Sequence, residues 1–344
     1  MERSSSISVA VVGLGYWGPN LARNFAALDD CELRWCCDVS EEKRRRLQSA
    51  FPGTRFTADL GDLLADPELD AVVLATDVPS HARLATEVLR AGKHCFVEKP
   101  LARSAAEATA VVDEAVAADR VLMVGHLLEY HPGVAKLKEM VDAGELGDVR
   151  YVYSNRLNLG KVREDENALW SLGAHDVSVL LHLFEEEPVE ALAHGESFVR
   201  DGVEDVVFCY LRFPSGRVAH MHLSWLDPHK ERRFTVVGSD RMATFDDMAL
   251  ERKVTIYDKG VDPPIRNYGE YITRSGDVMS PQISNEEPLR IECRHFVECV
   301  RDGVQPRSGP ASGLRAVRVL EALQRSLEAG GVPQTLEPAA APGR

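Results

Sequence analysis

The stretch ISVAVVGLGYWGPNLARNFAAL, residues 7–28, decides the fold of this chain. It has the pattern of a short apolar strand, a glycine-rich turn and a helix. The turn contains a GxGxxG motif formed by Gly13, Gly15 and Gly18. The first glycine of such a motif allows a tight turn, the second lets the backbone approach a pyrophosphate, and the third lets helix and strand pack closely. The sequence therefore predicts a dinucleotide site at the N-terminus of this helix.

A second strand, CELRWCCDVS (31–40), ends in Asp38, 20 residues beyond Gly18. An acidic side chain at this position accepts hydrogen bonds from the adenosine ribose hydroxyls and repels a 2′-phosphate, so it predicts NAD rather than NADP. The run EEKRRR (41–46) follows closely. One of its arginines could accommodate a phosphate, and the alternative interpretation is a solvated helix face.

Strands and helices continue to alternate up to residue 126. Buried strands are expected in LDAVVLAT (69–76), AGKHCFVEKPLA (91–102) and VLMVGH (121–126). This alternation predicts a parallel sheet with helices on both faces, which binds ligands at the carboxyl ends of its strands. Four candidate residues fall at such ends: Thr76, Glu98, Lys99 and His126. Further cofactor-binding candidates are Tyr16, Trp17 and His81.

The pattern changes from about residue 124. Strands are expected within 149–160, 203–213, 217–226, 232–247 and 253–260, and helices at 168–184, 286–302 and 311–328. These elements predict an α+β domain with an open, mainly antiparallel sheet, following an N-terminal Rossmann fold, in an α/β protein. The segment 268–284 reads as a polar loop. The expected domains are 1–124, 125–330 and a flexible tail at 331–344.

The second domain supplies the candidates for substrate binding. Asn167, Ser171 and His175 are spaced four apart, so they stack along one side of a helix whose other residues are largely apolar. Burying this polar column costs free energy unless it meets partners or a ligand. Further candidates are Tyr130, Arg156, Asn158 and Arg163. The arginines suit a carboxylate or diphosphate, and the alternative interpretation is ordinary surface charge.

Composition excludes several classes of protein. The 344 residues carry a formal charge of −14, which argues against a nucleic-acid partner. No run of about 18 apolar residues occurs, so no membrane span is expected, and the N-terminus lacks a signal-peptide layout. The seven cysteines include no CxxC pair. This pattern predicts reduced cysteines in a cytoplasmic protein and no metal site.

The motifs together resemble the glucose–fructose oxidoreductase/inositol dehydrogenase family, Gfo/Idh/MocA, over nearly the whole chain. The resemblance rests on GxGxxG, ATDVPSH (75–81), Glu98-Lys99-Pro100 and the glycine-x-histidine of residues 173–175. It implies that Lys99 lies beside the nicotinamide and contacts the hydroxyl that is oxidised, with a cis peptide bond at Pro100. It also implies that His175 accepts the hydroxyl proton. Many relatives carry an aspartate where this chain has Ser171, which predicts a weaker base here.

One branch of that family is matched more finely, by GYWGPNLARNF (15–25), VGHLLEYHPGV (124–134), NRLNLGKVREDENALW (155–170), VVGSDRMATFDD (236–247) and EPLRIECRHFVECV (287–300). These segments look like UDP-sugar 3-dehydrogenases, especially the UDP-N-acetylglucosaminuronate 3-dehydrogenase branch. The resemblance implies NAD-dependent oxidation of C3 of a UDP-sugar in amino-sugar biosynthesis. An inositol, aminocyclitol or antibiotic-sugar dehydrogenase is the nearby alternative.

An alternative from a different class is a non-catalytic NAD-binding sensor. Lys99 and His175 argue against it, and Ser171 argues for it. The expected partner beyond the small substrate is a second copy of the chain, because an open sheet leaves one face exposed and the resembling family commonly pairs it. A homodimer or homotetramer is therefore predicted.

Overall fold

The computed structural model describes residues 6–160, 162–163, 166–262 and 271–337. The chain forms two compact units. Met1–Tyr130 with Glu286–Arg318 makes the first, and His131–Asn285 with Val319–Arg344 makes the second. This division differs from the predicted boundary at 124/125, because the segment after residue 285 returns to the first unit. Phe296 places its ring 6.2 Å from Phe25 and 5.6 Å from Phe96, both edge-on, and no local sequence signal announces such a contact.

The first unit is built from alternating strands and helices. Its elements are β1 (Ile7–Val12), α1 (Gly18–Ala26), β2 (Cys31–Cys37), α2 (Glu41–Gln48), β3 (Arg55–Thr57), α3 (Leu60–Leu64), β4 (Ala71–Leu74), α4 (Val78–Arg90), β5 (His94–Glu98), α5 (Ala105–Ala118), β6 (Leu122–Gly125), the 3₁₀ turn η1 (Leu127–Tyr130), α8 (Pro288–Asp302) and the first part of α9 (Pro310–Glu328).

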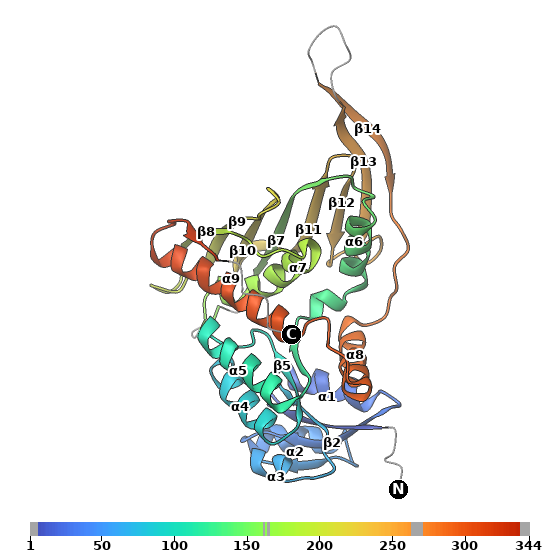
Figure 1. The fold of residues 1–344 in the computed structure, drawn as a ribbon, viewed down its shortest axis with the longest axis vertical. Helices are drawn as coiled ribbons and strands as arrows, with labels where there is room; N and C mark the ends of the chain where they lie inside the picture. Colours follow the sequence, from blue (N-terminus) through green and yellow to red (C-terminus); the bar gives the residue numbers. More distant parts are fainter. Residues whose placement is uncertain (1–5, 161, 164–165, 263–270, 338–344) are drawn as a thin grey trace. The chain divides into compact units, whose positions relative to one another are not determined.

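The strands form a parallel sheet in the order β3-β2-β1-β4-β5-β6. This is the strand order of a Rossmann fold, and ligands bind such sheets where the order reverses, here between β1 and β4. β4, in the middle of the sheet, is buried at every position, as expected for a parallel strand covered on both faces. The edge strand β6 is buried at every position as well. Helices α4 and α5 pack side by side, and α1 packs against α8 (Figure 1). The predicted N-terminal Rossmann fold is confirmed.

The second unit contains a nine-stranded sheet and its covering helices. Its elements are α6 (Pro132–Asp142), β7 (Val149–Leu159), the π-helical turn η2 (Leu169–Gly173), α7 (Ala174–Phe184), β8 (Glu190–Glu196), β9 (Val206–Arg212), β10 (Val218–Ser224), β11 (Leu226–Gly238), β12 (Met242–Asp246), β13 (Val254–Asp262), β14 (Ile272–Met279), β15 (Gln334–Thr335) and the rest of α9.

The strand order is β14-β13-β12-β11-β7-β10-β9-β8-β15. Only β7 and β10 pair in parallel among the strands described, so the prediction of a mainly antiparallel sheet is confirmed. Alternate residues of β9 are buried, as are those of β10 up to Leu223, and the residues between them are exposed or partly exposed. One face of the sheet therefore packs on α6, η2 and α7, and the other carries aromatic and polar side chains.

Two segments of this unit differ from the sequence-based expectation. The predicted polar loop contains β14, which pairs with β13 to make the hairpin at the end of the sheet in Figure 1. Residues 268–270 of that loop lie outside the described residues. The predicted tail contains β15, which pairs with β8. Both segments form strands because a neighbouring strand supplies partners for their backbone N–H and C=O groups. Their polar composition gave no indication of this pairing. In the part of the chain that the structure describes, no helix has the length and apolarity needed to cross a membrane.

Candidate functional site

The glycine turn after β1 shows three different backbone requirements. Gly13 has φ +91°, and a Cβ there would lie 2.6 Å from the Ala75 carbonyl oxygen. A Cβ on Gly18 would lie 1.9 Å from the Gly13 carbonyl oxygen. Around Gly15, in contrast, a Cβ would meet nothing within 4 Å. Gly13 and Gly18 therefore allow close packing of the turn, whereas Gly15 borders open space that a pyrophosphate can approach.

The N-terminus of α1 follows this turn. Trp17 is the N-cap residue, and in the described structure no side chain caps the first turn of the helix. Pro19 has no N–H, and the Asn20 N–H donates to the Trp17 carbonyl at 2.9 Å. The helix dipole and the backbone of the glycine turn are therefore what favour an anionic group here. The neighbouring Tyr16 is 92% exposed, and its ring stacks on that of Trp17 at a centroid distance of 6.3 Å.

Asp38 lies at the end of β2 in a hydrogen-bonded, buried position. Its Oδ2 accepts from the backbone N–H of Leu14 at 2.7 Å, and its Oδ1 accepts from the N–H of Ser40 at 2.8 Å. The Lys43 ammonium lies 3.5 Å from Oδ2, and the Arg44 guanidinium donates to the Asp38 carbonyl oxygen. Each carboxylate oxygen keeps a further lone pair for a ribose hydroxyl. The basic run on α2 is therefore partly engaged with the Asp38 loop.

Thr76 and His81 connect the end of β4 to the turn after β5. The His81 Nδ1 lies 2.8 Å from the Pro100 carbonyl oxygen, and its Nε2 lies 3.2 Å from the Thr76 carbonyl oxygen. Burial lowers the pKa of His81, so a neutral ring donates to one of these two carbonyls. The Thr76 hydroxyl accepts from Ser80 at 2.7 Å. His81 is thus enclosed, which assigns it to bracing the Lys99-Pro100 segment.

The Glu98-Lys99-Pro100 motif forms the carboxyl end of β5. The Lys99-Pro100 peptide bond is cis, which confirms the expectation from the sequence. The Lys99 N–H lies 3.3 Å from the Glu98 Oε2, and the Trp17 indole also donates to this carboxyl. Burial raises the pKa of Glu98 to about 7, against the opposing effects of the Lys99 charge and these two donors. The glycine turn and the Glu-Lys-Pro motif are therefore in direct contact through Trp17.

Two buried carboxyl groups were missed by sequence reasoning. Burial raises the pKa of Glu129 to about 8, although Arg307 and Ser312 counteract it. Burial also raises the pKa of Glu292 well above its ordinary value, and the charges of Glu98 and Glu129 act in the same direction. Both Glu292 oxygens are buried without a hydrogen-bond partner among the described residues. The only signal for them was an acidic residue within an apolar pattern, in HLLEYHP and LRIECRHF.

Tyr130 lies in the core of the first unit. It is 2% exposed, its hydroxyl is 2.9 Å from the Ser308 hydroxyl, and the Arg307 guanidinium lies 5.0 Å from its ring centroid. Burial raises the pKa of Tyr130. These contacts already satisfy its polar atom, so we do not retain Tyr130 among the proposed substrate contacts.

In the second unit, a π-helical turn, η2, precedes His175. Such turns interrupt α-helices and occur frequently at functional sites. A π turn has more residues per turn than an α-helix, so the offset between Ser171 and His175 differs from that assumed for a regular helix. Ser171 is buried and His175 is partly buried. The next residue, Asp176, points to a different partner.

That partner is Arg156 on β7. The Nε and Nη2 atoms of Arg156 both lie 2.7 Å from the Asp176 Oδ1, and the Ser154 hydroxyl donates to Oδ2 at 3.0 Å. Asp176 is completely buried and Arg156 nearly so. The guanidinium that the sequence assigned to an anionic substrate is therefore paired inside this unit.

The remaining substrate candidates have different environments. The Asn167 amide donates to Glu204 at 2.6 Å and to Gln324 at 2.9 Å, so this end of the column is satisfied within the unit. The Asn158 amide folds against the backbone of Gly160, where a Cβ would lie 2.1 Å from its Nδ2. Arg163 is exposed and pairs with Glu166 at 2.8 Å. Of the two arginines, Arg163 is the one able to exchange its partner for a ligand.

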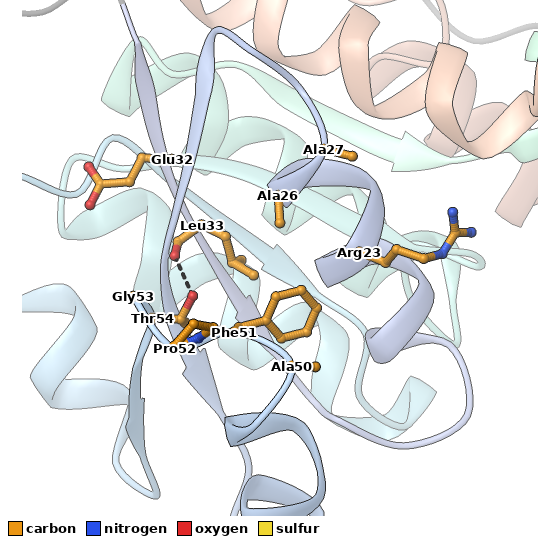
Figure 2. Close-up of a pocket in the computed structure, with 10 residues that line it drawn as sticks. All are labelled: Arg23, Ala26, Ala27, Glu32, Leu33, Ala50, Phe51, Pro52, Gly53 and Thr54. Carbon is orange, nitrogen blue, oxygen red and sulfur yellow. Dashed lines mark hydrogen bonds between the residues drawn. The ribbon is translucent and has the colours of Figure 1, made fainter.

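A hollow of about 580 Å³ on the first unit is shown in Figure 2. Phe51 lies beside it, and the Thr54 hydroxyl donates to the Leu33 carbonyl at 2.8 Å. Arg23 at its rim is paired with Glu287 at 2.6 Å. None of the predicted cofactor-binding residues lines this hollow, so it is separate from the candidate dinucleotide site.

The first unit thus fits a dinucleotide. Its open Gly15 position, its uncapped helix N-terminus and its buried Asp38 carboxylate lie at the carboxyl edge of the sheet, where the strand order reverses. Glu98 and Lys99 follow on the same edge, at the end of β5. The structure places these residues at the ends of three different strands, β1, β2 and β5.

Comparison with known proteins agrees with this geometry. A family model described as an oxidoreductase family with an NAD-binding Rossmann fold matches residues 7–126, and the GFO/IDH/MocA C-terminal domain matches residues 134–244. UDP-N-acetylglucosamine 3-dehydrogenase from Acidithiobacillus ferrooxidans is 30% identical over 92% of this chain and 98% of its own length. Myo-inositol 2-dehydrogenase from Thermotoga maritima is 27% identical over 93% and 96%.

A solved structure adds a relative with its cofactor. GenD2 from gentamicin A biosynthesis, in complex with NAD, is 25% identical, covers 98% of each chain and superposes with a TM-score of 0.82. The predicted NAD cofactor and oxidoreductase class are confirmed by these matches. The chain therefore belongs to the Gfo/Idh/MocA family of NAD-dependent oxidoreductases.

Proposed function

We propose that this enzyme oxidises a secondary hydroxyl of a sugar, with C3 of a UDP-sugar such as UDP-N-acetylglucosaminuronic acid as the first candidate. The observation that carries the proposal is the position of Lys99, directly after β5 at the carboxyl edge of the sheet, on the same edge as a glycine turn that fits NAD. The relative named UDP-N-acetylglucosamine 3-dehydrogenase supports the choice of sugar class and carbon.

Each residue of the proposed site has a separate task. NAD, when bound, supplies the ring that accepts hydride. Lys99 holds the substrate oxygen and stabilises the negative charge that develops on it. His175 accepts the hydroxyl proton. Asp38, Gly15 and the N-terminus of α1 hold the cofactor.

A second candidate is an uncharged polyol such as an inositol or aminocyclitol. It is favoured by the pairing of Arg156 with Asp176, which occupies one of the two arginines assigned to an anionic substrate. The relative named myo-inositol 2-dehydrogenase is consistent with it. Under this alternative, Arg163 would have no ligand contact.

The test is reduction of NAD by a matched panel containing UDP-N-acetylglucosaminuronic acid, UDP-N-acetylglucosamine, myo-inositol and an aminocyclitol. We expect NADH with a UDP-sugar, and turnover of the polyols alone would establish the second candidate. With a UDP-sugar, Arg163→Ala should raise KM by about 30-fold, because loss of a charge-assisted contact costs roughly 2 kcal/mol. Arg83→Ala, which removes an exposed arginine on α4, is the matched control.

The proposed assembly is a homodimer or homotetramer formed through the outer face of the second unit. That face carries stacked rings across three strands. Tyr153 lies 5.2 Å from His220 and Phe208 lies 4.4 Å from His222, and Phe208 is 52% exposed. Aromatic surfaces of this kind favour protein–protein contacts. The cytoplasm stays the proposed location, on cysteine usage alone.

A further inference from the structure

A histidine outside the proposed catalytic pair lies next to Lys99 in the first unit. β5 and β6 are parallel, and their last registered pair is Glu98 with Gly125. Lys99 and His126 are the next residue of each strand, so both lie at the carboxyl edge of the sheet. The His126 N–H donates to the Val124 carbonyl at 2.7 Å, and its carbonyl accepts from Glu129 at 2.9 Å. These two backbone hydrogen bonds fix the position of the His126 backbone, from which the imidazole extends.

The imidazole of His126 is enclosed and its hydrogen bonding is incomplete. It is 1% exposed, and neither ring nitrogen has a hydrogen-bond partner among the described residues. A buried polar group left without a partner is destabilising, and native proteins rarely retain one. The enclosure also excludes direct contact with a substrate. A small polar partner inside the protein is what this ring requires.

The charge that acts on His126 is that of Lys99. Burial first, and then the Lys99 ammonium, lower the pKa of His126 to about 3. The ring is therefore neutral at physiological pH, with one nitrogen as acceptor and one as donor. An ammonium has three donors, so Lys99 can engage His126 while it keeps other contacts.

We propose that His126 is a positioning residue for Lys99, and that its neutral imidazole accepts a hydrogen bond relayed from the Lys99 Nζ through one buried water. A bridging water satisfies two polar groups that do not touch directly. Glu98 restrains the same segment, because its Oε2 accepts from the Lys99 N–H and its carboxyl group also accepts from Trp17. The ammonium would thus be held in place before a substrate oxygen arrives.

The consequence for Lys99 can be measured without a substrate. An acceptor stabilises the protonated amine, so its removal lowers the pKa of Lys99. His126→Met removes the acceptor, and His126→Gln, which has the same length, retains it. We would follow acetylation of Lys99 by trace acetic anhydride as a function of pH, quantified by peptide mass spectrometry on the full chain with and without NAD.

We expect His126→Met to label Lys99 about three- to tenfold faster at a fixed pH below its pKa, which corresponds to a pKa lowered by about 0.5 to 1 unit. His126→Gln should stay close to the wild-type rate. His94→Gln is the matched control. His94 begins the same strand, about 16 Å from Lys99, and its Nδ1 accepts from Val121. Circular dichroism would confirm that each variant is folded.

Equal labelling in the wild type and in folded His126→Met would overturn the proposal, as would identical behaviour of the Met and Gln variants. If the Met variant does not fold, His126→Asn replaces it, and the shorter amide should give labelling faster than that of His126→Gln. Labelling of the Asn variant at the Gln rate would also count against the proposal.

The catalytic part of this inference rests on the proposed dehydrogenase function. There, His126→Met should lower kcat while KM for NAD stays unchanged, and His126→Gln should restore kcat. Absence of turnover with every member of the substrate panel in the wild type would defeat the proposed function. The labelling comparison would still decide the role of His126, so the two failures are distinguishable.

Discussion

Arg156 and Asp176 form a buried ion pair that joins β7 to α7, with two guanidinium nitrogens 2.7 Å from one carboxylate oxygen. Asp176 directly follows His175, the proposed base. A carboxylate next to a histidine in sequence invites the interpretation that it orients the imidazole. Its actual partner is Arg156, so Asp176 holds the helix that carries His175 onto the sheet.

The first prediction concerns this ion pair. Arg156→Ala should lower the free energy of unfolding by about 3–5 kcal/mol, because it leaves a buried carboxylate without its partner. Arg156→Met combined with Asp176→Asn should recover part of the loss, since no charge is then buried and Ser154 keeps an acceptor. Urea unfolding measures both. Arg163→Ala, which breaks an exposed pair, should cost less than about 1 kcal/mol. A loss that small for Arg156→Ala would contradict the prediction.

The second prediction concerns cofactor choice. NAD should bind at least about tenfold more tightly than NADP, or roughly 1.4 kcal/mol, because the Asp38 carboxylate repels a 2′-phosphate. Asp38→Asn and Asp38→Ala should both bring the dissociation constants of NAD and NADP closer together, as measured by fluorescence titration. Lys43 lies 3.5 Å from this carboxylate. In Asp38→Asn, the Lys43 ammonium becomes available to a 2′-phosphate, so the variant should bind NADP more tightly than the wild type does. Adding Lys43→Ala should remove this gain in NADP affinity. Tighter binding of NADP by the wild type would refute this assignment.

The third prediction concerns the serine that precedes His175 by four residues. His175→Ala should lower turnover by about 10²- to 10⁴-fold, the usual contribution of a general base, and Lys99→Ala should be at least as damaging. Ser171→Asp should move the acidic limb of the pH–rate profile to higher pH, because a nearby carboxylate favours protonated histidine. Ser171→Ala is the control and should leave the limb close to its wild-type position.

Two results would contradict that account. Wild-type turnover in His175→Ala would remove the histidine from catalysis. An unmoved profile in an active Ser171→Asp enzyme would mean that the two side chains do not meet across the π turn η2.

The fourth prediction concerns Glu292, whose pKa burial raises well above its ordinary value. Above the pKa of the unfolded chain, the native state keeps a proton that the unfolded state has lost. Stability therefore falls as pH rises, by up to about 1.4 kcal/mol per pH unit. Glu292→Met should remove this slope and stabilise the protein more at pH 8 than at pH 6, measured by chemical denaturation. The control is Glu298→Gln on the same helix, where the glutamate side chain is 44% exposed. It should leave the free energy of unfolding at pH 6 and at pH 8 nearly unchanged. Equal effects of Glu292→Met at both pH values would count against a proton held there.

The Rossmann half was accessible from the sequence because its determinants are local. The glycine turn, Asp38 and the strand ends each depend on residues that are neighbours in the chain. Alternating strands and helices leave few ways to arrange a parallel sheet. The resemblance to the family added Lys99 and the cis bond at Pro100, which the structure contains.

Tertiary structure alone decided the partners of the buried polar groups. Arg156 and Asp176 meet because Ser154 and Arg156, two residues apart on β7, lie on the face of the strand that is turned toward α7. Tyr130 is a core residue because Ser308, far along the chain, satisfies its hydroxyl. Sequence patterns report which residues are apolar, and they do not report which distant group opposes a given polar atom.

Contacts between distant segments also explain why α8 and β14 differ from the sequence-based expectation. Helix α8 joins the first unit through the ring contacts of Phe296, and β14 is a strand because β13 offers it a backbone edge. The sequence by itself determined the dinucleotide half, where hydrogen bonds and turns close over short chain distances. Tertiary structure decided the strand order of the second unit and the charge pairing next to His175, because those contacts join segments that become neighbours only after the chain has folded.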